Sequence, residues 1–174
     1  MEHSAINILP TGVRTCSTVS LALLLISACA PLQQGQQLIG MREADVQARF
    51  GAPTDTFYLA DGTHRWIYST QPLGSESYAA TFYREGRLGM YKQMLQYDEL
   101  NKAIVGNWTK RDVEEHFGRS REPVQYFRLM AREVWTYRVG QTGDWHVLYH
   151  FYFDAGGVLR NVQVTPDPLF EVLT

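Results

Sequence analysis

The sequence predicts an α+β fold made of two tandem repeats, each with two short helices packed on a three- or four-stranded antiparallel sheet. The same order of signals occurs twice, over residues 39 to 95 and again over 104 to 165. Each copy has a short amphipathic segment that ends in Phe-Gly, and then a Trp-x-Tyr strand followed by a hairpin-like run. We place the repeats at residues 38–95 and 96–166, with a C-terminal tail at 167–174.

The N-terminal segment has the features of an export signal. An apolar run of about a dozen residues follows Arg14, which is the length of a signal-peptide core and too short to span a bilayer. The run ends in ISAC at residues 26–29, which resembles the bacterial lipobox, where a branched apolar residue and two small residues precede an acylated cysteine. We therefore expect residues 1–28 to be a lipoprotein signal peptide and Cys29 to carry lipid. The alternative is an ordinary cleaved signal with an incidental cysteine.

The segment after Cys29 fits an anchored protein. Residues 29–37 are polar without periodicity and predict a short flexible tether. Ala30 stands where an aspartate would signal retention in the inner membrane of enteric bacteria. By that resemblance we expect a lipid anchor in the outer membrane, on its periplasmic face.

Cysteine use and net charge exclude several classes of protein. Cys16 and Cys29 both lie within the first thirty residues, so the rest of the chain can form no internal disulfide and no cysteine-based metal cluster. Lys and Arg number 16 against 18 for Asp and Glu, so the chain has no net basic field that would hold DNA or RNA.

The two predicted helices share a valine and a phenylalanine four residues apart, followed by a glycine suited to a helix C-terminus. These residues are Val46, Phe50 and Gly51, and Val113, Phe117 and Gly118. Thr109 and Asp112 predict a capping box for the second helix, whereas Arg42 cannot cap the first in the same way. Upstream, Leu100 and Ile104 indicate a further short helix, with a fainter counterpart at residues 38–39.

The strands follow the helices in both copies. Trp66 and Tyr68, like Trp135 and Tyr137, are two residues apart and therefore share one face of a strand, which we expect to lie under the helices. Next come two β-rich runs with tight turns at Gly86 and at residues 156–157, which predict hairpins.

This order of signals resembles the SmpA/OmlA domain, the family of the outer-membrane assembly lipoprotein BamE. The first copy carries the resemblance in Gly40, Met41, Val46, Gly51, Pro53, Trp66 and Tyr68. The second copy keeps Gly106, Thr109, Val113, Gly118, Trp135 and Tyr137. It departs by one extra residue after its first glycine, by lacking the methionine, and by four residues between Gly118 and Pro123. A tandem of such units is also similar to the β-lactamase inhibitor protein fold, whose two repeats form one broad sheet that grips an enzyme.

The run from residue 145 to 153 is apolar or aromatic on both sides of the predicted strand. Because helices can cover only one side, the other side is a candidate surface for a protein partner. That side carries His146, Leu148, His150 and Tyr152. The alternative is a central strand covered by the other repeat or by loops.

The sequence predicts no catalytic residues, metal site or cofactor. His146 and His150 could share a metal ion on a helix, but on a strand they lie roughly 13 Å apart, which is too far for one ion. Asp144 stands near His146, yet no serine or cysteine nucleophile sits in a recognisable turn.

We therefore expect a non-catalytic adaptor or scaffold in envelope or outer-membrane protein assembly. Its expected partners are the membrane, through lipid at Cys29, and an envelope protein. The resemblance implies that this protein belongs to the outer-membrane assembly machinery. The alternative is an inhibitor or ligand-binding module that blocks an envelope or secreted enzyme through its sheet face.

Overall fold

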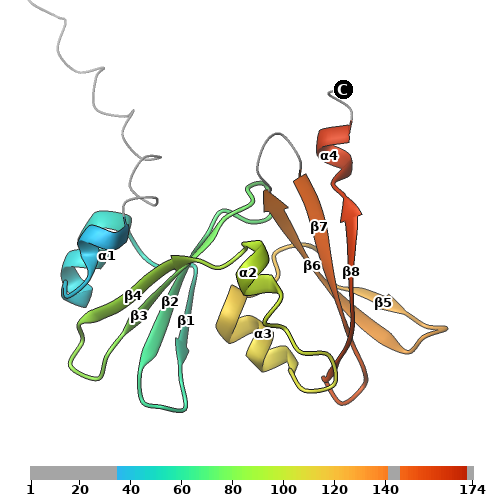
Figure 1. Cartoon of the computed structure of the whole chain (residues 1–174), viewed down its shortest axis with the longest axis horizontal. Helices are drawn as coiled ribbons and strands as arrows, with labels where there is room; N and C mark the ends of the chain where they lie inside the picture. The colour runs from blue at the N-terminus through green and yellow to red at the C-terminus, as the bar shows by residue number, and fades with distance from the viewer. Residues whose placement is uncertain (1–34, 141–145, 172–174) are drawn as a thin grey trace, which may run out of the picture. The chain divides into compact units, whose positions relative to one another are not determined.

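The computed structural model describes residues 35–140 and 146–171 (Figure 1). The first half contains a 3-10 turn η1 (Gly35–Leu38), α1 (Glu43–Phe50), β1 (Asp55–Tyr58), β2 (His64–Ser69), β3 (Ser77–Phe82) and β4 (Leu88–Gln93). The second half contains α2 (Tyr97–Leu100), α3 (Lys110–Phe117), β5 (Gln125–Phe127), β6 (Arg132–Gly140), β7 (His146–Phe153), β8 (Leu159–Pro166) and α4 (Pro168–Glu171).

The strands form two antiparallel sheets in which neighbours in the chain are neighbours in space. Sheet 1 has the order β1-β2-β3-β4, and sheet 2 has the order β5-β6-β7-β8. This confirms the predicted α+β class and the antiparallel pairing, with four strands in each sheet. The helix expected around Leu100 and Ile104 is only the four-residue α2, because the chain turns at Ile104, whose carbonyl accepts from Asn107 and Trp108.

The helix ends follow the signals in the sequence. Thr109 and Asp112 form the predicted capping box at the start of α3, and Arg42 makes no side-chain cap at the start of α1. Gly51 and Gly118 end the two helices at φ values of +80° and +87°, a backbone conformation that favours glycine.

The elements form alternating layers of helix and sheet, with α3 between the two sheets (Figure 1). One face of sheet 1 packs on α1 in a cluster that includes Val46, Trp66 and Tyr68. The other face of sheet 1 and one face of sheet 2 share a second cluster around Val113 and Phe117. Trp135 and Tyr137 lie in that second cluster, so both aromatic pairs are buried under a helix, as predicted.

The two halves repeat several hydrogen bonds at matching places. The N–H of Gly40 donates to Leu88 O (2.7 Å), and that of Gly106 donates to Leu159 O (2.8 Å). The Tyr68 hydroxyl donates to Gly51 O (3.4 Å), and the Tyr137 hydroxyl donates to Gly118 O (2.8 Å). The registers agree as well, because Tyr68 pairs with Tyr78 in sheet 1 and Tyr137 pairs with Tyr149 in sheet 2. Positions in the two sheets can therefore be compared one by one.

In the part of the chain that the structure describes, no helix has the length and apolar character needed to cross a membrane. The expected signal peptide, Cys29 and Ala30 lie outside the described residues, as do Asp144 and Trp145.

Candidate binding surface on the second sheet

Sheet 2 is covered by α3 on one face only. The side of β7 that faces α3 carries Tyr149, Phe151 and Phe153, all buried in the shared core. The opposite side of β7 carries the alternating residues Leu148, His150 and Tyr152. We call this opposite side the outer face of sheet 2.

The four residues predicted as a partner surface all fall on the outer face, but they have different surroundings. Leu148 and His150 line a pocket of about 420 Å³. Tyr152 is mostly buried and donates a hydrogen bond to Gln163 Oε1 (2.7 Å). The His146 ring stacks on Phe170 of α4, with ring centroids 3.7 Å apart and planes 8° apart. Leu148 and His150, in the middle of β7, therefore line the pocket, whereas His146 and Tyr152 do not.

The pocket is also lined by residues that are far from β7 in the sequence. Its lining comes from the β2–β3 loop, the loop before β5, the start of β5, and from β6, β7 and α4: Pro72, Leu73, Glu122, Pro123, Gln125, Thr136, Arg138, Leu148, His150, Pro168 and Leu169. Leu73 and Leu169 are among the exposed large hydrophobic residues of the described chain. Leu73 and Leu169 thus give the pocket an apolar rim, and its polar side chains come from the strands and from Glu122 in the loop before β5.

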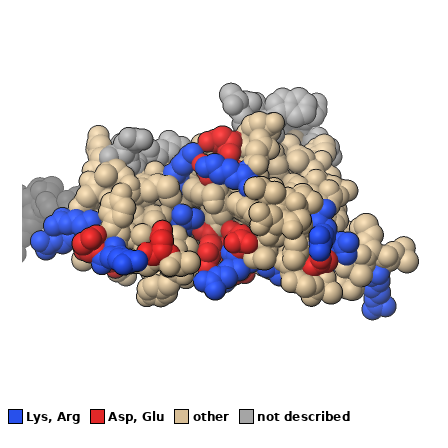
Figure 2. All heavy atoms as spheres, turned by 60° about the horizontal axis from the view of Figure 1, so that its bottom comes forward, with Lys and Arg blue, Asp and Glu red and all other residues tan. Residues whose placement is uncertain are grey.

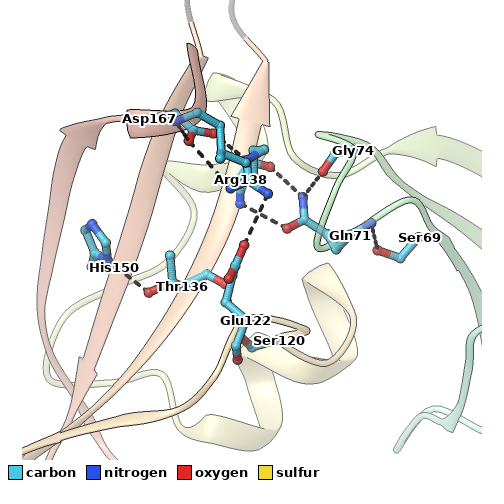
Figure 3. A network of polar contacts seen from close by, with 10 residues as sticks. Ser69, Gln71, Gly74, Ser120, Glu122, Thr136, Arg138, His150 and Asp167 are labelled. Carbon is cyan, nitrogen blue, oxygen red and sulfur yellow. Dashed lines mark hydrogen bonds and ion pairs between the residues drawn. The ribbon is translucent and has the colours of Figure 1, made fainter. Parts of the chain in front are cut away.

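A buried arginine lies at one side of the pocket (Figure 3). The guanidinium of Arg138, only 5% exposed, is paired with the buried carboxylate of Asp167 and with Glu122 Oε1, the latter at 3.1 Å. Asp167 also accepts the N–H of Leu169 (3.1 Å) in α4. A buried charge is tolerated when it is paired and hydrogen-bonded, and this network holds α4 against β6.

The β2–β3 loop is fixed to β6 by one side chain (Figure 3). Because β5 pairs with β6 only as far as Val134, the backbone of Arg138 has no strand partner on that side. The Gln71 amide takes that place, since its Nε2 donates to Arg138 O (2.6 Å) and its Oε1 accepts from Arg138 N (3.0 Å). The Ser120 hydroxyl donates to Thr136 O (3.0 Å) in the same way. These side chains satisfy backbone groups that would otherwise form an open sheet edge.

His150 is held between two hydroxyls. Its Nδ1 lies 3.0 Å from Thr136 Oγ1, and its Nε2 lies 2.9 Å from Thr165 Oγ1. Burial lowers the pKa of His150 below its ordinary value of 6.5, so the ring is neutral at pH 7. A neutral imidazole offers one donor and one acceptor, and both are engaged here. The ring is thereby held in a fixed orientation on the pocket wall.

A second hollow, of about 400 Å³, lies beside α3 and includes Arg65, Trp108 and His116 in its lining. Behind it, the buried Glu99 accepts from Lys92 Nζ (2.5 Å), Lys102 Nζ (2.7 Å) and His116 Nε2 (2.8 Å). Burial raises the pKa of Glu99, but the hydrogen bonds from Lys102, Lys92 and His116 outweigh it and lower the pKa to about 2. Burial lowers the pKa of His116 despite its bond to Glu99. These contacts tie α2 to β4 and α3.

Within residues 35–140 and 146–171, no group of three His, Cys, Asp or Glu side chains could hold a metal ion. Sequence reasoning found the strand positions but missed Gln71, Arg138 and Asp167. No local pattern marks Gln71 or Arg138, because their contact joins residues 67 apart in the chain. Asp167 directly before Pro168 is a typical helix start and was the one available signal for α4.

No family model matches the sequence, and no curated protein matches it. Among solved structures, the chain is similar to a cysteine-rich secretory protein from Staphylococcus aureus, with 12% identity and a TM-score of 0.29 over 76% of this chain and 44% of that one. It is also similar to an extracellular protein containing a SCP domain from Bacillus anthracis, with 16% identity and a TM-score of 0.30 over 95% of this chain and 52% of that one. The chain thus spans about half the length of these two proteins, and scores this low carry no argument about fold or function.

Proposed function

We propose that this chain is a non-catalytic binding module of the outer membrane, anchored by lipid at Cys29, and that it captures an envelope protein on the outer face of sheet 2. One observation carries the binding site. The outer face holds the pocket around Leu148 and His150 at positions that, in sheet 1, are covered by α3. The proposal includes a tandem duplication of BamE-like units, with η1 and α1 matching α2 and α3, which the recurring hydrogen bonds support.

The chemistry of the pocket suits binding better than turnover. The guanidinium of Arg138 is paired with two carboxylates, and both nitrogens of His150 contact hydroxyls. These groups keep the walls rigid, and a rigid surface loses little entropy when it binds a partner. The apolar rim formed by Leu73 and Leu169 supplies the area for an inserted apolar side chain.

Site-specific photo-crosslinking in cells tests the proposal. A photoreactive amino acid at position 148 or 73 is expected to capture the same envelope protein, because both positions line the pocket. The same group at Ala44, an exposed position of α1, is the matched control and is expected to capture none of it. Leu73→Arg is expected to reduce capture from position 148. Equal capture from positions 44 and 148, or none from 148, would remove the proposed site.

The same experiment separates the adaptor from the alternative, an inhibitor or ligand-binding module. An adaptor is expected to copurify with membrane-bound assembly components, whereas an inhibitor forms a tight 1:1 complex with a soluble enzyme. Mass spectrometry of the N-terminal peptide of the exported protein tests lipid at Cys29. An unmodified thiol there would leave the binding site standing but remove the anchor.

A further inference from the structure

The hairpin between β5 and β6 is the most exposed apolar segment of the described chain. Five large hydrophobic residues in the hairpin or directly before it are exposed: Val124, Tyr126, Phe127, Leu129 and Met130. Leu129, with a relative exposure of 104%, has essentially no protein contact. The hairpin projects from the rest of sheet 2 (Figure 1), and none of these five residues lines the pocket. Exposed apolar residues gathered at one hairpin in this way indicate a site of interaction.

The matching hairpin between β1 and β2 shows that the turn itself does not require these residues. Gly62 N donates to Leu59 O (3.0 Å) and Ala131 N donates to Arg128 O (3.2 Å), so the two turns close alike. In the first turn Asp61 accepts from Thr63 N (2.9 Å), and glycine occupies the position with positive φ.

The second turn has the apolar residues Leu129 and Met130 at the places of Ala60 and Asp61. It also has Ala131 at φ +49°, a conformation that alanine adopts at a cost. The tip is therefore apolar even though a polar residue and a glycine, as in the β1–β2 turn, would suit this turn better.

The charged residues next to the tip are arginines, and Glu133, across from Tyr126 on β6, is paired with Lys110. No Asp or Glu lies between Pro123 and Arg132, and Arg128 and Arg132 stand on either side of the tip. This contrasts with the net charge of −2 for the whole chain. In Figure 2 the projecting end of the molecule on the right shows tan and blue spheres. Apolar side chains with flanking arginines are the composition that enters the boundary between the headgroups and acyl chains of an anionic membrane.

The geometry favours a membrane over a protein groove as the occupant. Energetically important residues of protein interfaces lie in well-packed pockets near the centre of the contact. Here the apolar residues form a protruding tip, which fits a soft, planar surface. We propose that the β5–β6 hairpin inserts Leu129 and Met130 into an anionic lipid surface, while Arg128 and Arg132 contact the headgroups. This contact goes beyond the proposed partner site and does not use the pocket.

Fluorescence of a labelled full-length chain tests this proposal. Cys16 and Cys29 are replaced by serine, and an environment-sensitive fluorophore is attached to Met130→Cys or, as the matched control, to Ala60→Cys in the β1–β2 turn. Vesicles contain phosphatidylcholine with phosphatidylserine, or phosphatidylcholine alone. The label at position 130 is expected to brighten and to be protected severalfold from aqueous iodide on the anionic vesicles. The label at position 60 is expected to stay accessible, even if the N-terminal segment binds the vesicles.

Two further variants of the chain labelled at position 130 separate the apolar and the electrostatic contributions. Leu129→Asp is expected to abolish protection, and its thermal unfolding midpoint should not change because the side chain is exposed. Arg128→Ala is expected to raise the lipid concentration needed for half-maximal protection about fivefold, since one arginine near an anionic surface contributes about that much. If this variant needs no more lipid than the parent chain, the electrostatic part of the proposal is wrong.

Other outcomes would overturn the proposal as a whole. Equal protection at positions 130 and 60 would do so, as would no protection at 130. If vesicles give no protection and a photo-crosslinker at position 129 captures a protein in cells, the hairpin is a protein contact instead. The pocket proposal is tested separately by crosslinking at position 148, so either proposal can fail alone.

Discussion

The two sheets share one scaffold, but they differ on the face opposite their own helix. In sheet 1 this face receives α3 and carries Ile67 and Ala79, both fully buried. The matching positions in sheet 2 are Thr136 and His150, which hydrogen-bond to each other beside the pocket. The same strand pairing thus supports an apolar face packed on α3 in the first half of the chain, and a more polar, partly exposed face in the second half.

The difference follows from what each face contacts. The end of α3 enters sheet 1 so closely that a Cβ at Gly118 would lie 2.8 Å from Ile67 Cγ2. The Ser77 hydroxyl donates to Phe117 O (2.6 Å), which satisfies a carbonyl at the helix end. Leu148 occupies the position in sheet 2 that Ser77 occupies in sheet 1, and its side chain has no hydrogen-bond donor. The outer face of sheet 2 is therefore not built to receive a second helix end in the same way.

The phenylalanines that end α1 and α3 give the largest expected difference in stability between the two halves of the chain. Phe117 is 1% exposed and contacts the rings of Tyr137 and Phe151 in the core between the sheets. Phe50 is only half-buried, beside Tyr68 and Tyr91. We expect Phe117→Ala to lower the free energy of unfolding by about 3–5 kcal/mol, and Phe50→Ala by roughly half as much. Urea unfolding with comparable m-values measures both. Equal losses would mean that α3 is no more central to the core than α1.

The dependence of stability on pH gives the second-largest expected effect, and the titrating residues responsible lie in the second half of the chain. Glu99 has its pKa lowered from 4.5 to about 2, so its stabilising contribution is present above pH 4.5 and is lost as the pH falls toward 2. His116 and His150 have lowered pKa values because of burial, so the unfolded state takes up protons first. Their contribution to stability is complete above pH 6.5 and declines below it.

The Glu99→Gln variant isolates the lower pH range. We expect it to cost about 2 kcal/mol at neutral pH, because hydrogen bonds to a charged group are removed, and to flatten the decline below pH 4.5. Asp98→Asn is the matched control, since Asp98 bonds to the same Lys92 but is exposed. Thermal unfolding midpoints between pH 7 and pH 3 compare the two. A control that flattens the curve as much as Glu99→Gln would show that the hydrogen bonds to the buried Glu99 are not the cause.

The parts of the fold that sequence reasoning predicted depend on short-range patterns. The spacing of Val113 and Phe117, the capping box at Thr109 and the Trp-x-Tyr pairs all follow from helix or strand geometry, and the structure confirms them. The alternation along β7 also separated the helix-facing side from the outer face.

The pocket itself could not be predicted in this way. Its walls depend on the contact of Gln71 with Arg138 and on the position of Leu73, which a tertiary contact sets and no periodicity records. The segment expected as a C-terminal tail contains α4, whose four residues are too few to show a helical period. The ion pairs of Glu99 join α2 to β4 and α3, which are separate in the sequence. Acidic residues are usually exposed, as its neighbour Asp98 is, so nothing in the sequence indicates that Glu99 is buried.

The smallest expected contrast concerns the starts of α1 and α3, which have the same length but different caps. Thr109 accepts from Asp112 N at the start of α3, whereas Arg42 has no side-chain cap at the start of α1 despite an extended backbone that would allow one. Thr109→Ala is expected to lower the free energy of unfolding by about 1 kcal/mol. Arg42→Thr is expected to raise it by up to about 1 kcal/mol, because a hydroxyl there can accept from the first turn. Chemical denaturation measures both changes. If Arg42→Thr gives no gain, the start of α1 is already held by the backbone bridge between Arg42 and Arg87, just before β4, and a cap adds nothing.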